Sequence, residues 1–315
     1  MTRSPAPPLV VTLGDPAGIG PEVALRALEG RRDCLLVGDA ALIAAAAERL
    51  AVAPPLRVHS PPEVACPPAL LFSGAPHADC GRAAAAAVRE GARLVAQGEG
   101  SALVTAPLNK EALGLAGEPF PGHTELLAHH FGGCRVRMLL QGPSLRVVLV
   151  TIHEALRKVP ELIDEAGIVE TCALAAGFLA AHGVAAPRLA VCALNPHGGD
   201  NGRFGDEDQR VVAPAIAAAR AQGLDVHGPF AADTLFPQAA RPDSPYAAVI
   251  AMYHDQGLIP VKLASFGTAT NVTLGLPIVR TSPDHGTAFD IAGQGLADPS
   301  SMEAALRVAA ELAAR

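Results

Sequence analysis

Three histidines each follow an apolar run that is rich in β-branched residues. The runs and the histidines that they precede are 145–151 before His153, 188–194 before His197 and 247–253 before His254. We expect each run to be a strand, and ligands of open α/β sheets bind beyond the carboxyl ends of the strands. Three neutral imidazoles at such an edge suit a divalent metal and leave room for substrate or water. Three isolated loop or capping histidines are an equally good alternative, and because there is no compact H-x-x-x-H spacing the spacing alone does not establish a metal site.

Two aspartates stand where they could assist these histidines. Asp255 directly follows His254, and Asp233 lies in the segment 232–236. We expect them to carry protons or to orient the imidazoles, and capping of a helix or loop is an equally good explanation. Together with Lys262 they form the predicted catalytic group.

Candidate anion ligands occur in two places. The string Gly122-His123-Thr124-Glu125 reads as a turn that leads into a helix, where side chains and free backbone N–H groups could hold a phosphate or carboxylate. An ordinary threonine N-cap is the alternative. The second place is the apolar region 258–279 and its border, where three polar residues would be costly to bury unpaired, so we expect them to face a polar cleft rather than bulk solvent. They are Lys262, Asn271 and Arg280.

The glycine-containing segment 14–22 follows an expected strand and precedes an expected helix. Gly18 and Gly20 lead straight into Pro21, so the segment does not match G-x-G-x-x-G, and it lacks the Lys-Ser/Thr of a Walker loop. A standard dinucleotide fingerprint is therefore absent.

Short apolar runs alternate with alanine-rich helical stretches over the 315 residues, half of which are hydrophobic and 3% aromatic. This alternation predicts an α/β fold with a largely parallel sheet. Further expected strands are 8–13, 34–38, 56–59 and 101–105, and expected helices are 21–28, 40–50, 82–97, 161–183, 207–222 and 300–315.

The net charge of −7 and the absence of a long Lys/Arg run argue against a nucleic-acid partner. The six cysteines form no C-x-x-C pair and are expected to be reduced thiols. Residues 1–8 carry no apolar signal segment and no stretch is long enough for a membrane span, so we expect a cytoplasmic protein.

Several strings resemble the PdxA family, the 4-hydroxythreonine-4-phosphate dehydrogenases and close relatives that act on four-carbon sugar-acid phosphates. The matching strings are GDPAGIGPE (14–22), TAPLNKEAL (105–113), GHTE (122–125), HEALRKVP (153–160), NPHGG (195–199), ADTLF (232–236), YHDQGLIPVK (253–262) and NVTLGLPIVRTSPDHGTAFDIAG (271–293). The resemblance runs from about residue 9 to the C-terminus. It implies an isocitrate/isopropylmalate dehydrogenase-like fold, with two α/β/α lobes around a cleft, and a homodimer. We expect one lobe from 1–125 with 265–315 and the other from 126–264.

The resemblance also implies roles for single residues. His153, His197 and His254 match metal ligands of a site shared between two subunits, and His123, Thr124, Lys262, Asn271 and Arg280 match substrate-binding positions. His285, Gly286 and Asp290 match the segment along the adenosine part of the cofactor. A carboxylate at Asp290 would favour NAD over NADP by repelling a 2′-phosphate.

The expected activity is the NAD-dependent and divalent-metal-dependent oxidation, with decarboxylation, of 4-phosphooxy-L-threonine in pyridoxal 5′-phosphate biosynthesis. Zinc, cobalt, magnesium and manganese all remain open as the metal. Two departures from the family pattern leave the substrate open: 265–270 lacks an arginine, and Asp200-Asn201 is unusual. The alternatives are D-threonate or D-erythronate 4-phosphate, a dihydrodiol of aromatic dicarboxylate breakdown, or a non-catalytic ligand-binding scaffold.

Overall fold

The computed structural model of the protein describes residues 6–62, 65–265 and 267–314. Two stretches discussed above lie partly outside these ranges. They are residues 1–8, of which 1–5 are not described, and residues 265–270, of which Phe266 is not described. The chain forms two compact units, unit 1 (Met1–Val136 with Leu276–Ala314) and unit 2 (Arg137–Gly275). The lobe boundaries expected from the sequence stay a prediction, because compactness alone does not define a domain that folds independently.

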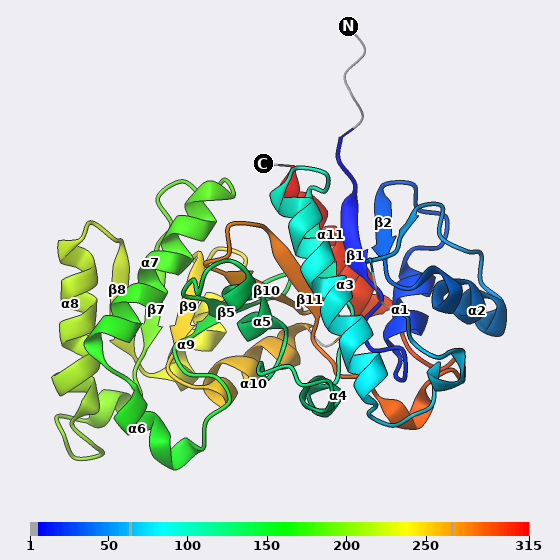
Figure 1. The fold of residues 1–315 in the computed structure, drawn as a ribbon. Helices are drawn as coiled ribbons and strands as arrows, with labels where there is room; N and C mark the ends of the chain where they lie inside the picture. The colour runs from blue at the N-terminus through cyan, green and yellow to red at the C-terminus, as the bar shows by residue number, and fades with distance from the viewer. Residues whose placement is uncertain (1–5, 63–64, 266, 315) are drawn as a thin grey trace, which may run out of the picture. The chain divides into compact units, whose positions relative to one another are not determined.

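Unit 1 contains a parallel sheet with the strand order β3-β2-β1-β4-β11 (Figure 1). Its strands are β1 (Leu9–Thr12), β2 (Cys34–Val37), β3 (Val58–His59), β4 (Ala102–Thr105) and β11 (Arg280–Pro283). Its α-helices are α1 (Gly20–Ala27), α2 (Ala40–Leu50), α3 (Ala78–Ala96), α4 (Lys110–Leu115), α5 (His123–His130) and α11 (Ser300–Ala313).

Helices cover both faces of this sheet, which explains why every residue of β1 is buried. Successive strand side chains point to opposite faces. Val11 belongs to a core cluster with Val23 of α1 and Leu306 of α11, whereas Val10 belongs to a second cluster with Val88 of α3. Burial on both faces is typical of parallel sheets.

Unit 2 contains a mixed sheet with the strand order β10-β5-β6-β9-β7-β8. Its strands are β5 (Arg137–Gln141), β6 (Arg146–Leu149), β7 (Leu189–Cys192), β8 (Val226–Phe230), β9 (Ala248–Ala251) and β10 (Thr270–Leu274). Its α-helices are α6 (Val159–Leu162), α7 (Glu165–Ala181), α8 (Ala213–Ala221), α9 (Ala232–Ala239) and α10 (His254–Ser265).

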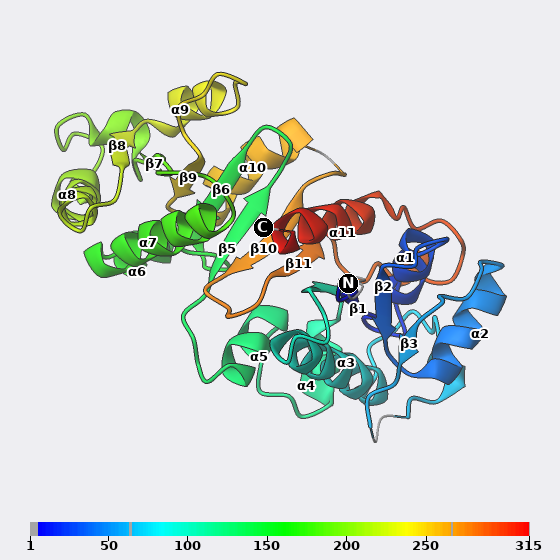
Figure 2. The same ribbon diagram turned by 90° about the horizontal axis from the view of Figure 1, so that it is seen from above.

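The β10–β5 and β5–β6 pairs are antiparallel, and the pairs among β6, β9, β7 and β8 are parallel. Figure 2 shows α7 and α10 on opposite sides of the strands of unit 2. The predicted α/β fold with a largely parallel sheet is therefore confirmed.

Two expected helices are interrupted. The stretch 161–183 divides into α6 and α7 because the Asp164 side chain accepts a hydrogen bond from the Gly167 N–H, at 2.6 Å, and caps α7. The stretch 207–222 opens with a π-helical turn, Asp208–Val212, before α8.

The six cysteines are free thiols, as expected. Among the described residues, no helix combines the length and apolar character that crossing a membrane requires.

Candidate active site

The carboxyl ends of β6 and β9 bring His153 and His254 together. The two strands are parallel neighbours, and beyond them the Thr151 hydroxyl donates a hydrogen bond to the Met252 carbonyl, at 2.8 Å. The two imidazole ring centroids lie 5.7 Å apart. Adjacent parallel strands that end in register thus deliver two of the predicted metal ligands to one place.

Asp255 lies beside the His254 imidazole, with its Oδ1 atom 2.7 Å from Nδ1. When Nδ1 carries the proton it donates to this carboxylate, and Nε2 keeps its lone pair for a metal ion. Carboxylates orient metal-ligating histidines in proteins in this way. The donor set at His254 therefore fits a divalent metal.

His197 follows β7, the other parallel neighbour of β9. Its backbone is left-handed, with φ at 54°, and its side chain is exposed, 6.4 Å from the Phe204 ring between centroids. Within the described part of one chain, no group of three or more His, Cys, Asp and Glu side chains is arranged to hold a metal. The three-histidine metal site therefore stays a prediction.

A cavity of about 530 Å³ opens beside this sheet edge in unit 2. Both predicted catalytic aspartates line it, together with His197, residues 193–196 and parts of α9 and α10. Asp233 accepts a hydrogen bond from the N–H of the next residue, Thr234, at 3.0 Å, but it does not cap α9, whose N-cap residue is Ala231 without a side-chain cap. A proton acceptor is thus available on two elements that border the cavity.

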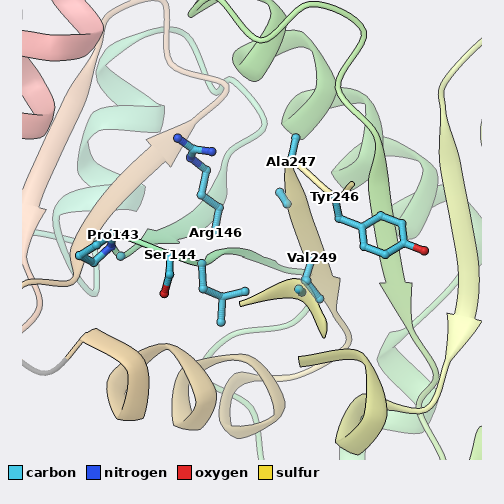
Figure 3. Close-up of a pocket in the computed structure, with 10 residues that line it drawn as sticks. Pro143, Ser144, Arg146, Tyr246, Ala247 and Val249 are labelled. Atoms are coloured by element: carbon cyan, nitrogen blue, oxygen red, sulfur yellow. The ribbon is translucent and has the colours of Figure 1, made fainter. Parts of the chain in front are cut away.

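A smaller cavity, of about 80 Å³, lies at the opposite edge of the unit 2 sheet (Figure 3). It is lined by the β5–β6 turn and by the starts of β6 and β9, including Ser144, Arg146 and Tyr246. None of the predicted site residues borders it, so it has no part in the site described above.

Arg280 of unit 1 is almost completely buried, with 2% of its surface exposed. It begins β11 and donates hydrogen bonds to the Thr105 hydroxyl at the end of β4, from Nε at 3.2 Å and from Nη2 at 2.5 Å. Burial lowers the pKa of Arg280 to about 10, and the nearby Glu125 opposes that shift. The guanidinium remains charged at neutral pH, and a desolvated cation of this kind favours a bound anion.

Two predicted anion ligands begin α5. Gly122 is the N-cap residue and no side chain caps the helix, so Thr124 is not the ordinary cap considered above. The Nε2 atom of His123 is buried without a hydrogen-bond partner. Burial, and then the charge of Arg280, hold the pKa of His123 well below its ordinary value. His123 is therefore neutral at physiological pH.

Lys262 and Asn271 belong to unit 2, whereas His123, Thr124 and Arg280 belong to unit 1. Lys262 is exposed on α10. The Oδ1 atom of Asn271, on β10, is buried without a hydrogen-bond partner. An unsatisfied buried carbonyl oxygen is costly, which favours a ligand or a solvent molecule as its missing donor.

The segments 14–22 and 285–293 lie against one another in unit 1. The Ile19 N–H donates a hydrogen bond to the Thr287 carbonyl at 2.9 Å, and the Glu22 carboxylate accepts one from the Ala297 N–H at 3.1 Å. The three predicted cofactor ligands are exposed along the second segment: His285, Gly286 and Asp290. Two motifs that are far apart in the sequence thus form one surface.

The family model described as "Pyridoxal phosphate biosynthetic protein PdxA" matches residues 31–309. This chain belongs to the PdxA family. A 4-hydroxythreonine-4-phosphate dehydrogenase of Geobacter metallireducens is 48% identical, over 98% of this chain and 96% of that protein. A D-threonate 4-phosphate dehydrogenase of Salmonella typhimurium is 43% identical, over 97% and 98%.

A solved structure of a PdxA relative supports the fold. The crystal structure of 4-hydroxythreonine-4-phosphate dehydrogenase from Klebsiella pneumoniae aligns with a TM-score of 0.89 at 40% identity, covering 98% of this chain and 99% of that one.

Three residues with a structural role were not predicted from the sequence. Gln256 and Asp208 hold the backbone that leads to His197, and Asp15, which follows β1, is a fully buried carboxyl. Gln256 and Asp15 lie inside two of the strings that resemble the family, 253–262 and 14–22, which is the signal that could have indicated them. For Asp208 the sequence offers no comparable signal.

Proposed function

We propose that this chain is a 4-hydroxythreonine-4-phosphate dehydrogenase that uses a nicotinamide cofactor and a divalent metal. The observation that carries the proposal is the pairing of His153 with His254 beside a cavity that Asp233 and Asp255 line. The similarity to dehydrogenases of that name along nearly the whole chain supports the substrate class.

The metal ligands in this proposal are His153, His197 and His254, and the Asp255 carboxylate orients the last of them. A bound divalent cation supplies Lewis-acid polarisation of the substrate hydroxyl. Zinc, cobalt, manganese and magnesium are all candidates, and imidazole ligands favour zinc and cobalt over manganese and magnesium, which prefer oxygen ligands.

Unit 1 contributes side chains that bind an anionic group of the substrate, one of them positively charged and the others neutral. Arg280 stays charged at neutral pH and binds the phosphate or the carboxylate of the substrate, while neutral His123 and Thr124 act through hydrogen bonds. In unit 2, Asn271 accepts a hydrogen bond from the substrate through its buried Oδ1, and Lys262 supplies a second cation.

The proton transfers are assigned to the residues of the predicted catalytic group. Asp233 or Asp255 accepts the proton of the substrate hydroxyl. Bound NAD would supply the hydride acceptor for the carbon that bears this hydroxyl. The bond to the carboxylate then breaks with release of CO2, and Lys262 donates a proton to the carbon left behind. The product is a ketone that keeps the phosphate of the substrate.

The cofactor is NAD rather than NADP in this proposal. His285, Gly286 and Asp290 lie on the surface that segments 14–22 and 285–293 form, and Asp290 is exposed there. Its carboxylate accepts hydrogen bonds from ribose hydroxyls and repels a 2′-phosphate.

A homodimer with a metal site shared between subunits completes the proposal. Within one chain the described residues form no complete metal cluster, which agrees with a site that takes ligands from a second copy. Two apolar residues of α10 that line the cavity are exposed, Ile259 at 56% and Leu263 at 83%. Exposed apolar side chains beside an incomplete site favour a subunit contact.

The test is a panel of 4-phosphooxy-L-threonine, D-threonate 4-phosphate, D-erythronate 4-phosphate and an aromatic cis-dihydrodiol, each with NAD and with NADP, followed by nicotinamide absorbance. We expect the highest kcat/KM with 4-phosphooxy-L-threonine and NAD. A higher kcat/KM with D-threonate 4-phosphate would instead establish the second candidate, which the Salmonella relative favours. Turnover of none of them, by protein loaded with each candidate metal, would leave a ligand-binding scaffold.

A further inference from the structure

Side chains satisfy several backbone polar groups between β7 and His197. The Ala193 N–H still donates a hydrogen bond to the Phe230 carbonyl of β8, at 2.7 Å, but the Ala193 carbonyl accepts one from Gln256 Nε2, also at 2.7 Å. The Leu194 and Asn195 N–H groups donate to the two carboxylate oxygens of Asp208, at 2.6 and 3.0 Å. Each of these three consecutive residues thus has one backbone polar group that a side chain satisfies.

Gln256 connects this segment to the turn that carries His254. While its Nε2 donates to Ala193, its Oε1 accepts a hydrogen bond from the Met252 N–H at 2.7 Å. Ala193 and Gln256 are 63 residues apart in the sequence. A single amide therefore joins the carboxyl ends of β7 and β9. A side chain needs both a donor and an acceptor for this, and glutamine supplies both.

Asp208 fixes the other side of the same segment. It is 2% exposed and begins the π-helical turn Asp208–Val212. The preceding Glu207 accepts a hydrogen bond from the Asn195 side-chain amide at 2.8 Å. π-helical turns inside helices occur frequently at functional sites.

The loop that follows has a conformation that needs such support. Six consecutive residues have positive φ angles: His197, Gly198, Gly199, Asp200, Asn201 and Gly202. Left-handed backbone is disfavoured for residues with a Cβ atom and persists only where the surroundings enforce it. Gly199 packs too tightly for a side chain, since a Cβ atom there would lie 2.7 Å from the Gly205 carbonyl oxygen. The Asp208 and Gln256 bonds anchor the start of this strained loop.

We propose that Gln256 and Asp208 are positioning residues that hold the backbone presenting His197 and His254 to the shared site, and so set the affinity for the divalent metal. This inference rests on the proposed function, because it needs the histidines to be metal ligands. Neither residue touches the metal or the substrate in this proposal. They act by holding the backbone that presents the ligands.

The test is titration of the purified, metal-free full chain with Co²⁺, followed by calorimetry and by visible absorption, which reports the ligand geometry. The variants are Gln256→Met, which keeps the length but loses both hydrogen bonds, and Asp208→Asn. Their matched controls are Gln209→Met and Asp206→Asn, at exposed positions of the same segment.

We expect both variants to bind Co²⁺ about tenfold more weakly or worse, with a changed Co²⁺ spectrum, as is typical when partners that orient metal ligands are removed. The two control variants should bind Co²⁺ with the affinity and the spectrum of the wild type. The fold-loss of Co²⁺ affinity in the double variant should be smaller than the product of the fold-losses in the two single variants, because the two side chains hold one segment. A Co²⁺ affinity of Gln256→Met equal to that of the wild type would overturn the inference.

Two further measurements separate this inference from the proposed function. If the wild type binds no Co²⁺, or His197→Ala binds it equally well, the metal site fails and the inference fails with it. If Gln256→Met lowers the unfolding midpoint of the metal-free chain markedly, the Co²⁺ affinity of Gln256→Glu is the measurement that tests the inference. That variant keeps an acceptor for Met252 and places a carboxylate oxygen against the Ala193 carbonyl, so weaker Co²⁺ binding is expected and unchanged binding overturns the inference.

Discussion

The guanidinium of Arg280 donates two hydrogen bonds to one neutral partner, the hydroxyl oxygen of Thr105. Both side chains are buried at the start of β11 and the end of β4. Two guanidinium nitrogens are held against one hydroxyl oxygen, which fixes the position of the Arg280 side chain at the carboxyl end of β4.

Arg280→Met should impair catalysis more than folding. Loss of a charge-assisted hydrogen bond to a substrate anion costs about 1.5–3 kcal/mol, which corresponds to roughly a 10- to 150-fold fall in kcat/KM. Methionine keeps the packing of the arginine stem, and each hydrogen bond to Thr105 that is lost contributes only about 0.5–1.5 kcal/mol to stability. Steady-state kinetics and thermal unfolding measure the two effects, with Arg280→Lys as a control for charge without the planar fork. A destabilised variant with unchanged kcat/KM would show a purely structural role.

His197→Ala should abolish turnover and leave the chain folded, because the exposed ring contributes little to packing. The measurements are NADH formation, the metal content of the purified protein and circular dichroism. His227→Ala is the matched control, since His227 instead contacts Asp225 near the start of β8. Full activity of His197→Ala with unchanged metal content would remove the metal-site proposal.

Asp15→Asn should stabilise the protein at neutral and alkaline pH. Burial raises the pKa of Asp15 from 3.8 to about 6, and hydrogen bonding to the Ala17 N–H opposes the shift. Because the folded-state pKa is raised, the stabilising contribution of the protonated carboxyl is complete below pH 3.8 and is lost as pH rises through about 6. A shift of this size corresponds to at most about 3 kcal/mol.

Urea unfolding of Asp15→Asn and of the wild type between pH 4 and pH 8 measures this effect, over a range chosen to span roughly both values of the pKa. The free energy of unfolding of the variant should equal that of the wild type near the acidic limit of this range and exceed it near the alkaline limit. Glu29→Gln, at an exposed position, is the control. If the difference in unfolding free energy between Asp15→Asn and the wild type does not change with pH, Asp15 is not a desolvated carboxyl.

Gly18→Ala should disturb the contact between segments 14–22 and 285–293. A Cβ atom at Gly18 would lie 2.6 Å from the Thr287 carbonyl oxygen and 2.8 Å from the Thr287 Cβ atom. Relief of such a clash typically costs about 1–3 kcal/mol of stability. The affinity for NAD should fall as well, because the displaced segment carries His285 and Asp290. Calorimetric NAD titration and urea unfolding measure both effects.

The control for that prediction is Gly114→Ala in α4, where an added Cβ atom has no neighbour within 4 Å. Alanine favours helical backbone over glycine by roughly 0.5–1 kcal/mol, so this variant should be neutral or more stable. If Gly18→Ala behaves like Gly114→Ala, the close approach of the two segments is not required for cofactor binding.

The sequence by itself determined the strands that end before His153, His197 and His254, because a continuous apolar, β-branched run is a local signal. It did not reveal β5, β8, β10 or β11. In β5 and β10, Arg137, Gln141 and Asn271 interrupt the apolar pattern. β10 forms through antiparallel pairing with β5, which is distant in the sequence, whereas β5 also pairs with β6 across a short turn.

Only the tertiary structure decided which strands are neighbours, and with them which side chains meet. The order β6-β9-β7 sets His153 beside His254, and it lets Gln256 bridge to Ala193. The burial of Arg280 and Asp15, which shifts their pKa values, follows from packing and has no local sequence signature. The physical reason is that apolar periodicity acts over a few residues, whereas desolvation and hydrogen-bond partnership depend on everything that surrounds a group after folding.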